Sequence, residues 1–269
     1  MSDRDYVRYE QTEHEGIVLI TLERPEKLNA ISTTMMGQLA GAFRRFDESE
    51  AFVAVLTGSG RAFSAGMDVM ENFAAGRKTM QAPDIGESFN PFWPGEASDE
   101  DAPTFYRGKQ RRLQKLVIAA VHGYAFGGGF LMALAADLCV AADDTVFEVS
   151  EVPRGLAAGW DLGYLNGMPR HVAMELALGL RMTGRRAYEL GIVNRLVAKD
   201  DLVTAALELA GQLCALPRAT LTANRALLDS LVPIVPSSVA DVAEAQRQRI
   251  AESPDAQAGF LGFAQKHAG

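Results

Sequence analysis

Three consecutive glycines, Gly127-Gly-Gly129, separate an apolar, strand-like segment from a helix-prone one. Because glycine has no side chain, another atom can approach the backbone closely at such a turn. The free N–H groups at the start of the following helix suit a bound anion or a developing oxyanion. The spacing fits neither a dinucleotide-binding G-x-G-x-x-G motif nor a P-loop. The glycines could also serve only to pack the helix tightly against the strand.

A second loop, earlier in the chain, also contains glycine and also follows an expected strand. Ser64-Ala-Gly-Met-Asp68 follows one expected strand, and His122 to Gly129 follows another. In this order and separation the two segments resemble the crotonase superfamily, whose largest part is the enoyl-CoA hydratases and isomerases. Arg24-Pro-Glu-Lys-Leu-Asn-Ala30 is similar to its early CoA-contact turn, and Phe147-Glu-Val-Ser-Glu151 to one of its later blocks. The resemblance covers nearly the whole chain.

The resemblance implies an oxyanion site made of two backbone N–H groups, those of Met67 and Gly128. Such donors polarise a thioester carbonyl and stabilise the enolate that forms when a proton leaves its α-carbon, by about 3–4 kcal/mol each. It also implies that the substrate is an acyl-CoA and that no cofactor beyond the CoA moiety of the substrate is needed. The CoA contacts that it implies are Arg24, Lys27, Ala30, Ala62, Ser64, Ala65 and Asp68.

The acid/base positions depart from the family pattern. Hydratases of the family use two glutamates, and here the first falls on Leu131 and the second on Glu151. A leucine cannot carry a proton, whereas a carboxyl beside an apolar acyl pocket has the raised pKa that suits proton transfer. Isomerases of the family use the second glutamate alone. We therefore expect Glu151 to act as a single acid/base, in double-bond isomerisation or a related enolate reaction.

Several alternatives remain open. A hydratase-lyase acting on an aryl or branched acyl-CoA also keeps the second glutamate, and Leu131 is compatible with a non-catalytic acyl-CoA-binding protein. The segment 155–163 stands where the family commonly has a glycine-rich turn, and Trp160 and Asp161 are additions there. Asp161 is a candidate second acid, although a helix-capping role is favoured over it. A hydrolase built from Ser64, His122 and Asp68 is disfavoured, because the chain lacks the G-x-S-x-G elbow.

The elements that position these residues follow from the apolar pattern. Residues 6–10 and 16–22 predict a β-hairpin, and residues 52–57, 117–121 and 137–142 predict buried strands. Ser32 is a suitable N-cap for a helix with apolar residues at Met36, Leu39, Phe43 and Phe46. Together these predict an α/β protein, and the resemblance implies a crotonase-like spiral of ββα units. We expect a core domain over 1–200 with a Pro-rich insert at 78–106, and a helical trimerisation region over 201–269.

Composition narrows the remaining classes of protein. The 269 residues are 48% hydrophobic and 22% charged, with a formal net charge of −8, which disfavours nucleic-acid binding. No apolar stretch reaches the roughly 18–20 residues of a membrane helix, and we expect a cytoplasmic protein without a membrane partner. Cys139 and Cys214 lie in apolar contexts, and the histidines are scattered, so no metal site is expected. The resemblance implies a homotrimer or hexamer.

Overall fold

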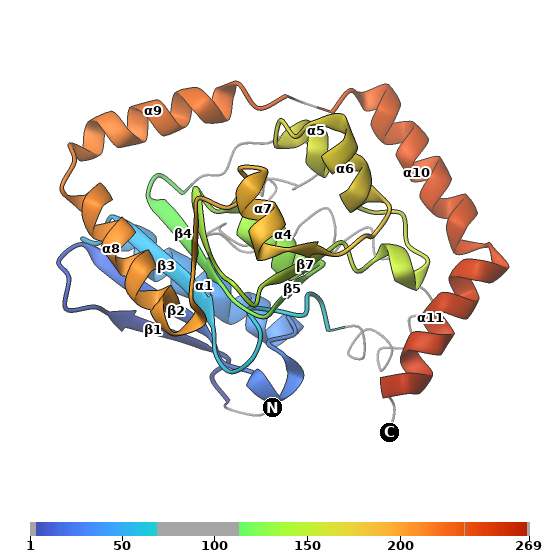
Figure 1. The fold of residues 1–269 in the computed structure, drawn as a ribbon, viewed down its shortest axis with the longest axis horizontal. Coiled ribbons are helices and arrows are strands. Elements are labelled where there is room, and N and C mark those ends of the chain that lie inside the picture. Colours follow the sequence, from blue (N-terminus) through green and yellow to red (C-terminus); the bar gives the residue numbers. More distant parts are fainter. Residues whose placement is uncertain (1–3, 69–112, 234, 268–269) are drawn as a thin grey trace.

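The computed structural model describes residues 4–68, 113–233 and 235–267, so the insert expected at 78–106 lies outside the described residues. A six-stranded sheet forms the centre of the molecule (Figure 1). Its first two strands pair antiparallel as the expected hairpin, and the other neighbours pair parallel. In spatial order the strands are β1 (Val7–Gln11), β2 (Ile17–Leu22), β3 (Val53–Gly58), β4 (Leu116–Val121), β6 (Leu138–Ala142) and β9 (Arg195–Val197).

Helices cover both faces of this sheet, which explains why its central strands are apolar throughout. Helix α1 (Thr33–Glu48) begins at Ser32, whose hydroxyl accepts a hydrogen bond from the Met35 N–H. It packs on the face that carries alternate residues such as Ala54 and Leu56. Helix α8 (Leu202–Cys214) packs on the opposite face, against Val53 and Val55. Helix α8 is therefore part of the core.

A second, smaller sheet receives the chain where it leaves β4. Its strands are β5 (Tyr124–Phe126), β7 (Val146–Glu148) and β8 (Met182–Thr183), in that order. Helix α4 (Gly128–Ala135) follows β5 after the single residue Gly127. The glycine turn thus lies between β5 of the small sheet and α4, against residues 64–66 of the loop after β3. Short helices complete this half of the molecule: α5 (Leu162–Leu165), α6 (Arg170–Ala177) and α7 (Gly184–Glu189).

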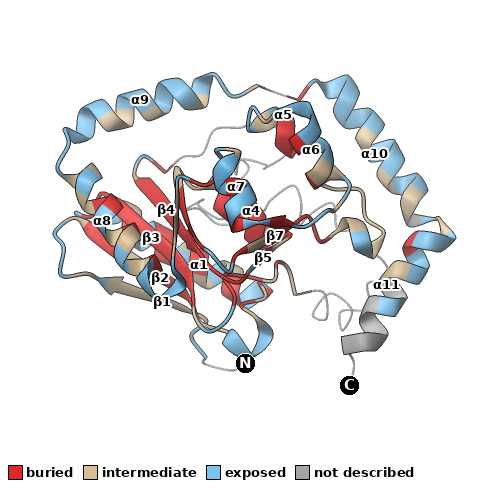
Figure 2. Cartoon of the chain, viewed as in Figure 1, coloured by how far each residue is buried: buried red, intermediate tan, exposed pale blue. Residues whose placement is uncertain are grey.

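The last three helices form an outer arm. Helices α9 (Arg218–Ser230), α10 (Ser237–Ala251) and α11 (Pro254–His267) run around the body, and α9 and α10 are mostly exposed (Figures 1 and 2). Proline stands at the start of each: Pro217 precedes α9, Pro236 precedes α10, and Pro254 is the first residue of α11. Helix α11 returns to the body and packs on the one-turn helix η3 (Val152–Arg154). Within the described residues, no helix combines the length and apolar character that crossing a membrane requires.

Candidate active site

The loop after β3 and the turn after β4 are joined by backbone contacts. Ser64 forms a parallel bridge with Ala125 of β5, and Met67 forms one with Ile31. A Cβ on Gly66 would lie 2.6 Å from the Phe126 carbonyl oxygen and 3.1 Å from the Gly128 nitrogen. The loop can therefore approach the turn this closely only because residue 66 is glycine.

The N–H groups of Met67 and Gly128 lie next to each other without acceptors. The bridge to Ile31 uses the Gly66 carbonyl and the Asp68 N–H, which leaves the Met67 N–H free on the other side. The Gly128 N–H belongs to the first turn of α4, where no intrahelical acceptor exists. Among the hydrogen bonds of the described residues, neither group is a donor. The two residues that the sequence predicted as oxyanion donors are thus brought together.

The three glycines of the turn have different surroundings. Gly127 has φ +49°, and a Cβ there would lie 2.6 Å from Oε1 of Glu151. A Cβ on Gly129 would lie 2.5 Å from the Ser64 carbonyl oxygen, so this glycine does permit tight packing. A Cβ on Gly128 would meet only ordinary contacts, 3.5 Å from Ile31 Cδ1 and 3.7 Å from the Met67 nitrogen. Packing therefore does not require glycine at 128, although a methyl group there would lie beside the Met67 nitrogen.

Asn29, which sequence reasoning missed, connects the early turn with the loop. It is fully buried with φ 53°, a left-handed conformation that asparagine tolerates better than most residues. Its side chain accepts from the Arg24 N–H and donates to the carbonyls of Ser59 and Ala62. The sequence offered a single indication of this role for Asn29, namely its place directly before Ala30 in a segment where no helix or strand was expected.

An ion pair fastens the loop on its other side. Nη1 of Arg24 lies 2.6 Å from Oδ2 of Asp68, and both side chains are mostly buried, with exposed fractions of 15% and 11%. The same guanidinium donates to the Ala30 carbonyl at 3.1 Å. Because Asp68 follows Met67 directly, this pair restrains the backbone that carries the Met67 N–H.

The expected CoA contacts differ in accessibility. Lys27 is exposed, and Ala30 and Ala65 are partly exposed. Ala62 and Ser64 are fully buried, so their side chains present no surface to a ligand and instead support the loop. The Ser64 hydroxyl donates to the Asn29 carbonyl and accepts from the Gly66 N–H.

Glu151 lies against the glycine turn, at the start of η3. Its Oε2 is buried and has no hydrogen-bond partner among the described residues. Burial raises the pKa of the Glu151 carboxyl above its ordinary value, and Glu148 adds to this, while its own N–H and Arg154 oppose it. Helix α11 supports this turn, since a Cβ on Gly155 would lie 2.4 Å from Cα of Ala256. The arrangement therefore places against the glycine turn a carboxyl with a higher proton affinity than an exposed glutamate, which suits proton transfer.

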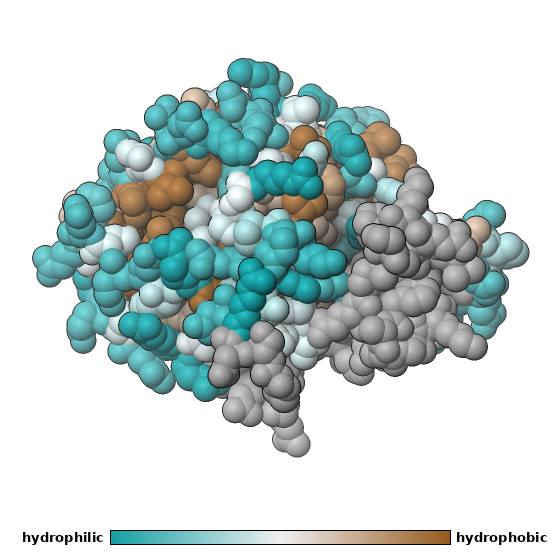
Figure 3. Space-filling model, turned by 90° about the horizontal axis from the view of Figure 1, so that it is seen from below, coloured by the Kyte–Doolittle hydropathy of each residue, from teal (hydrophilic) through white to brown (hydrophobic). Residues whose placement is uncertain are grey.

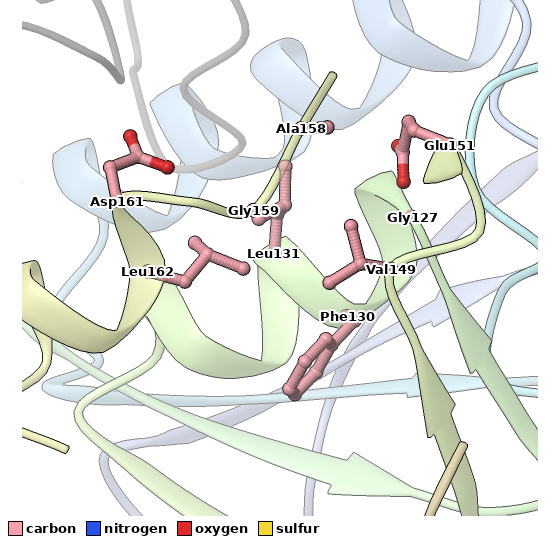
Figure 4. Close-up of a pocket in the computed structure, with 9 residues that line it drawn as sticks. All are labelled: Gly127, Phe130, Leu131, Val149, Glu151, Ala158, Gly159, Asp161 and Leu162. Carbon is pink, nitrogen blue, oxygen red and sulfur yellow. The ribbon is translucent and has the colours of Figure 1, made fainter. Parts of the chain in front are cut away.

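A small cavity of ≈ 20 Å³ lies beside this carboxyl (Figure 4). Asp161 lines it together with Glu151, although ten positions separate them in the chain. Leu131 and Gly159 lie between the two carboxyls in Figure 4. Asp161 stands at the N-cap of α5 but its side chain makes no capping hydrogen bond, so the capping interpretation is wrong. The remaining lining is Gly127, Phe130, Val149, Ala158 and Leu162.

The hydrolase alternative has no support in the geometry. Nε2 of His122 lies 3.1 Å from the Gly60 carbonyl oxygen, the Ser64 hydroxyl donates to the Asn29 carbonyl, and Asp68 pairs with Arg24. The three side chains therefore do not form a catalytic triad. Among the described residues, no group of three or more His, Cys, Asp or Glu could hold a metal ion.

The family model described as enoyl-CoA hydratase/isomerase matches residues 12–268. The chain belongs to this family. It is 39% identical to a carnitinyl-CoA dehydratase of Citrobacter koseri over 212 residues, which are 75% of this chain and 72% of that protein. It is also 35% identical to a mevalonyl-coenzyme A hydratase of Aspergillus fumigatus over 204 residues, 72% of this chain and 67% of that protein.

Solved structures agree with this membership of the enoyl-CoA hydratase/isomerase family. A carnitinyl-CoA dehydratase from Mycobacterium avium has a TM-score of 0.75 and 29% identity, with 97% of each chain covered. An enoyl-CoA hydratase from Mycobacterium tuberculosis has a TM-score of 0.69 and 34% identity, covering 97% of this chain and 96% of the other. The crotonase fold and the family predicted from the sequence are confirmed. The chain is an enzyme of a family that acts on acyl-CoA thioesters.

The contrast between Gly128 and Gly129 gives a matched pair of substitutions. We expect Gly128→Ala to fold with an unchanged melting temperature but to lose at least about tenfold in kcat/KM, because its methyl group would narrow the space beside the Met67 N–H. Gly129→Ala should instead lower the melting temperature, because its Cβ collides with the Ser64 carbonyl. Thermal unfolding and acyl-CoA kinetics measure the two effects. A folded, fully active Gly128→Ala enzyme would contradict this interpretation.

Breaking the ion pair should destabilise the loop. We expect Asp68→Asn to lower the free energy of unfolding by about 1–3 kcal/mol, because it leaves the mostly buried Arg24 without its countercharge. Urea denaturation of Asp68→Asn, Arg24→Gln and the double variant measures the coupling between the two side chains. Additive losses would show that the pair contributes nothing to stability.

Proposed function

We propose that this enzyme interconverts a 3-hydroxyacyl-CoA and the corresponding 2-enoyl-CoA through an enolate, with Glu151 carrying the C2 proton. The observation that carries this proposal is the buried Oε2 of Glu151, which lies against the glycine turn that carries the Gly128 N–H. Neither group has a hydrogen-bond partner among the described residues. A proton acceptor and an oxyanion site are the two groups that removal of a proton α to a thioester requires.

The proposed chemistry assigns one role to each group. The thioester carbonyl oxygen accepts hydrogen bonds from the N–H groups of Met67 and Gly128, for which the described residues offer no acceptor. As the C2 proton moves to the Glu151 carboxylate, negative charge develops on that oxygen, where the two donors stabilise it. CoA lies along the Arg24–Ala30 turn, where Lys27 offers an exposed positive charge. Ala30, Ala65 and Asp68 complete this proposed side of the site.

The names of the relatives favour addition or removal of water. One similar protein is a carnitinyl-CoA dehydratase and another a mevalonyl-coenzyme A hydratase. The second candidate is double-bond isomerisation with Glu151 alone, which Leu131 supports because it removes the first glutamate of the two-glutamate hydratases. Both candidates begin with the same proton transfer.

Exchange at C2 tests the shared step without assuming the product. In D₂O, a saturated acyl-CoA such as butyryl-CoA should take up deuterium at C2, and Glu151→Gln should slow this by at least about 100-fold because the amide cannot accept the proton. Mass spectrometry follows the uptake. Glu175→Gln, on an exposed ion pair of α6, is the matched control and should exchange as the wild type does. Binding of acyl-CoA without exchange would instead identify a non-catalytic binding protein.

We further propose that the outer helices assemble the chain into a trimer or a pair of trimers. Large apolar side chains are exposed at the end of α9 and on α10, including Leu228 at 67% and Leu231 at 78%. Apolar surface of this extent on a helical arm usually becomes buried against another copy. Figure 3 shows that apolar side chains also gather in patches on one face of the body. The partners of this enzyme would then be its acyl-CoA substrate and further copies of itself.

A charge on the apolar side of α9 should disrupt this assembly. Leu228→Glu is expected to shift the protein toward monomers, because burying an unpaired carboxylate in an interface costs several kcal/mol. Ala226→Glu adds the same charge to the opposite side of the helix and should leave the assembly unchanged. Light scattering after size-exclusion chromatography gives the masses. Two monomeric variants, or a monomeric wild type, would contradict the proposed interface.

A further inference from the structure

Asp161 is one of the most deeply buried charged residues of the described chain. It is 1% exposed, and both of its carboxylate oxygens are buried without a hydrogen-bond partner among the described residues. Its own N–H and that of Leu162 are near enough to influence the carboxyl but do not form hydrogen bonds with it. Arg247 of α10 acts only through space, and its guanidinium is paired with Glu244.

A carboxyl in this state weakens the fold. An unpaired polar group that is buried costs on the order of 1–3 kcal/mol, and an ionised one costs more. No cap, ion pair or hydrogen bond within the described residues compensates for Asp161. The walls around it are apolar, from Leu131, Val149 and Leu162. A structural role therefore does not explain the residue, whereas a ligand that enters the cavity would supply the missing partner.

The cavity beside Asp161 has the size of one water molecule. A volume of ≈ 20 Å³ exceeds the roughly 10–15 Å³ that a single water requires. Glu151 and Asp161 both line it, so a water or hydroxyl group placed there would lie between two carboxyls (Figure 4). Leu131, which lines the same cavity, cannot bond to that oxygen.

We propose that Asp161 is the second catalytic carboxyl of this enzyme and exchanges a proton with the C3 oxygen of the substrate. This inference rests on the proposed function, because it presumes that Glu151 handles the C2 proton. Asp161 then supplies, from the turn before α5, the acid that Leu131 of α4 cannot supply. Burial raises the pKa of the Asp161 carboxyl above its ordinary value, which favours the protonated form that the dehydration direction needs.

The two carboxyls act on the two bonds that break in dehydration. The Glu151 carboxylate takes the C2 proton, and the electron pair of that bond forms the C2=C3 double bond by way of the enolate. The C3–O bond breaks, and the Asp161 carboxylic acid donates its proton to the departing oxygen, which leaves as water. Glu151 is then protonated and Asp161 ionised, and a proton passed from one to the other through solvent restores the enzyme. Hydration follows the same steps in reverse.

Asp161→Asn separates this role from that of Glu151. We expect dehydration of 3-hydroxybutyryl-CoA and of branched and hydroxylated 3-hydroxyacyl-CoAs to fall by at least about 100-fold, with C2 exchange in butyryl-CoA within about threefold of the wild type. Glu151→Gln should lose both reactions. Tyr164→Phe, an exposed position on the same short helix, is the matched control and should retain both. Thioester absorbance reports dehydration, and mass spectrometry reports exchange.

The melting temperature of Asp161→Asn distinguishes a catalytic from a structural role, because the two roles predict changes of opposite sign. The Asp161 carboxyl has a higher pKa in the folded than in the unfolded chain, so its contribution to stability decreases as pH rises above the unfolded value. Asp161→Asn should therefore melt at or above the temperature of the wild type at neutral pH, with a difference that shrinks in acid. A residue with an essential structural partner would melt lower.

The outcomes are distinguishable. Selective loss of dehydration in a folded Asp161→Asn enzyme supports the assignment. Unchanged dehydration, or a parallel loss of dehydration and exchange, would overturn it while leaving the role of Glu151 intact. A wild type that catalyses neither reaction on any of these thioesters would instead refute the proposed function itself.

Discussion

Two backbone segments touch at Gly66 and Gly129, where a side chain on either residue would collide with a carbonyl oxygen. This contact brings the loop after β3 against the glycine turn after β5, and the N–H groups of Met67 and Gly128 there have no acceptor among the described residues. The rest of the site is arranged around it. Asn29 and the Arg24–Asp68 pair secure the loop, and the Gly127 N–H, bonded to the Glu148 carbonyl, secures the turn.

Several unsatisfied polar groups lie in and around this site. The N–H groups of Met67 and Gly128, Oε2 of Glu151 and both carboxylate oxygens of Asp161 lack hydrogen-bond partners within the described residues. Folded proteins satisfy nearly all such groups, and the exceptions cluster where a ligand completes them. The packing of α1 and α8 on the two faces of the sheet stabilises the fold. This stability offsets the free-energy cost of the unsatisfied polar groups at the site.

The sequence predicted the long elements and the backbone donors, and it could not predict how tertiary packing buries the acids. Strands such as β4 and helices such as α8 carry their own apolar patterns, but β5, β7 and β8 are too short for a pattern to reveal. Asn29 likewise lies in a segment that is too short for an apolar pattern to indicate its role. The sequence did not decide whether Asp161 caps a helix or acts as an acid. Its burial depends on tertiary contacts, since Val149 and Leu162 line the same cavity. The support of η3 by α11 joins residues about a hundred positions apart, which no local pattern shows.

Leu131 changes the site in two ways at once. It removes a proton-transferring group from α4, and it also adds an apolar wall to the cavity that Glu151 and Asp161 share. An apolar wall disfavours the charged form of both carboxyls, and burial is the largest cause of the raised pKa of each. A carboxyl that stays protonated to a higher pH is a better proton donor at neutral pH than an exposed one. The leucine is therefore consistent with retained catalysis, provided that Asp161, on the turn before α5, supplies the acid.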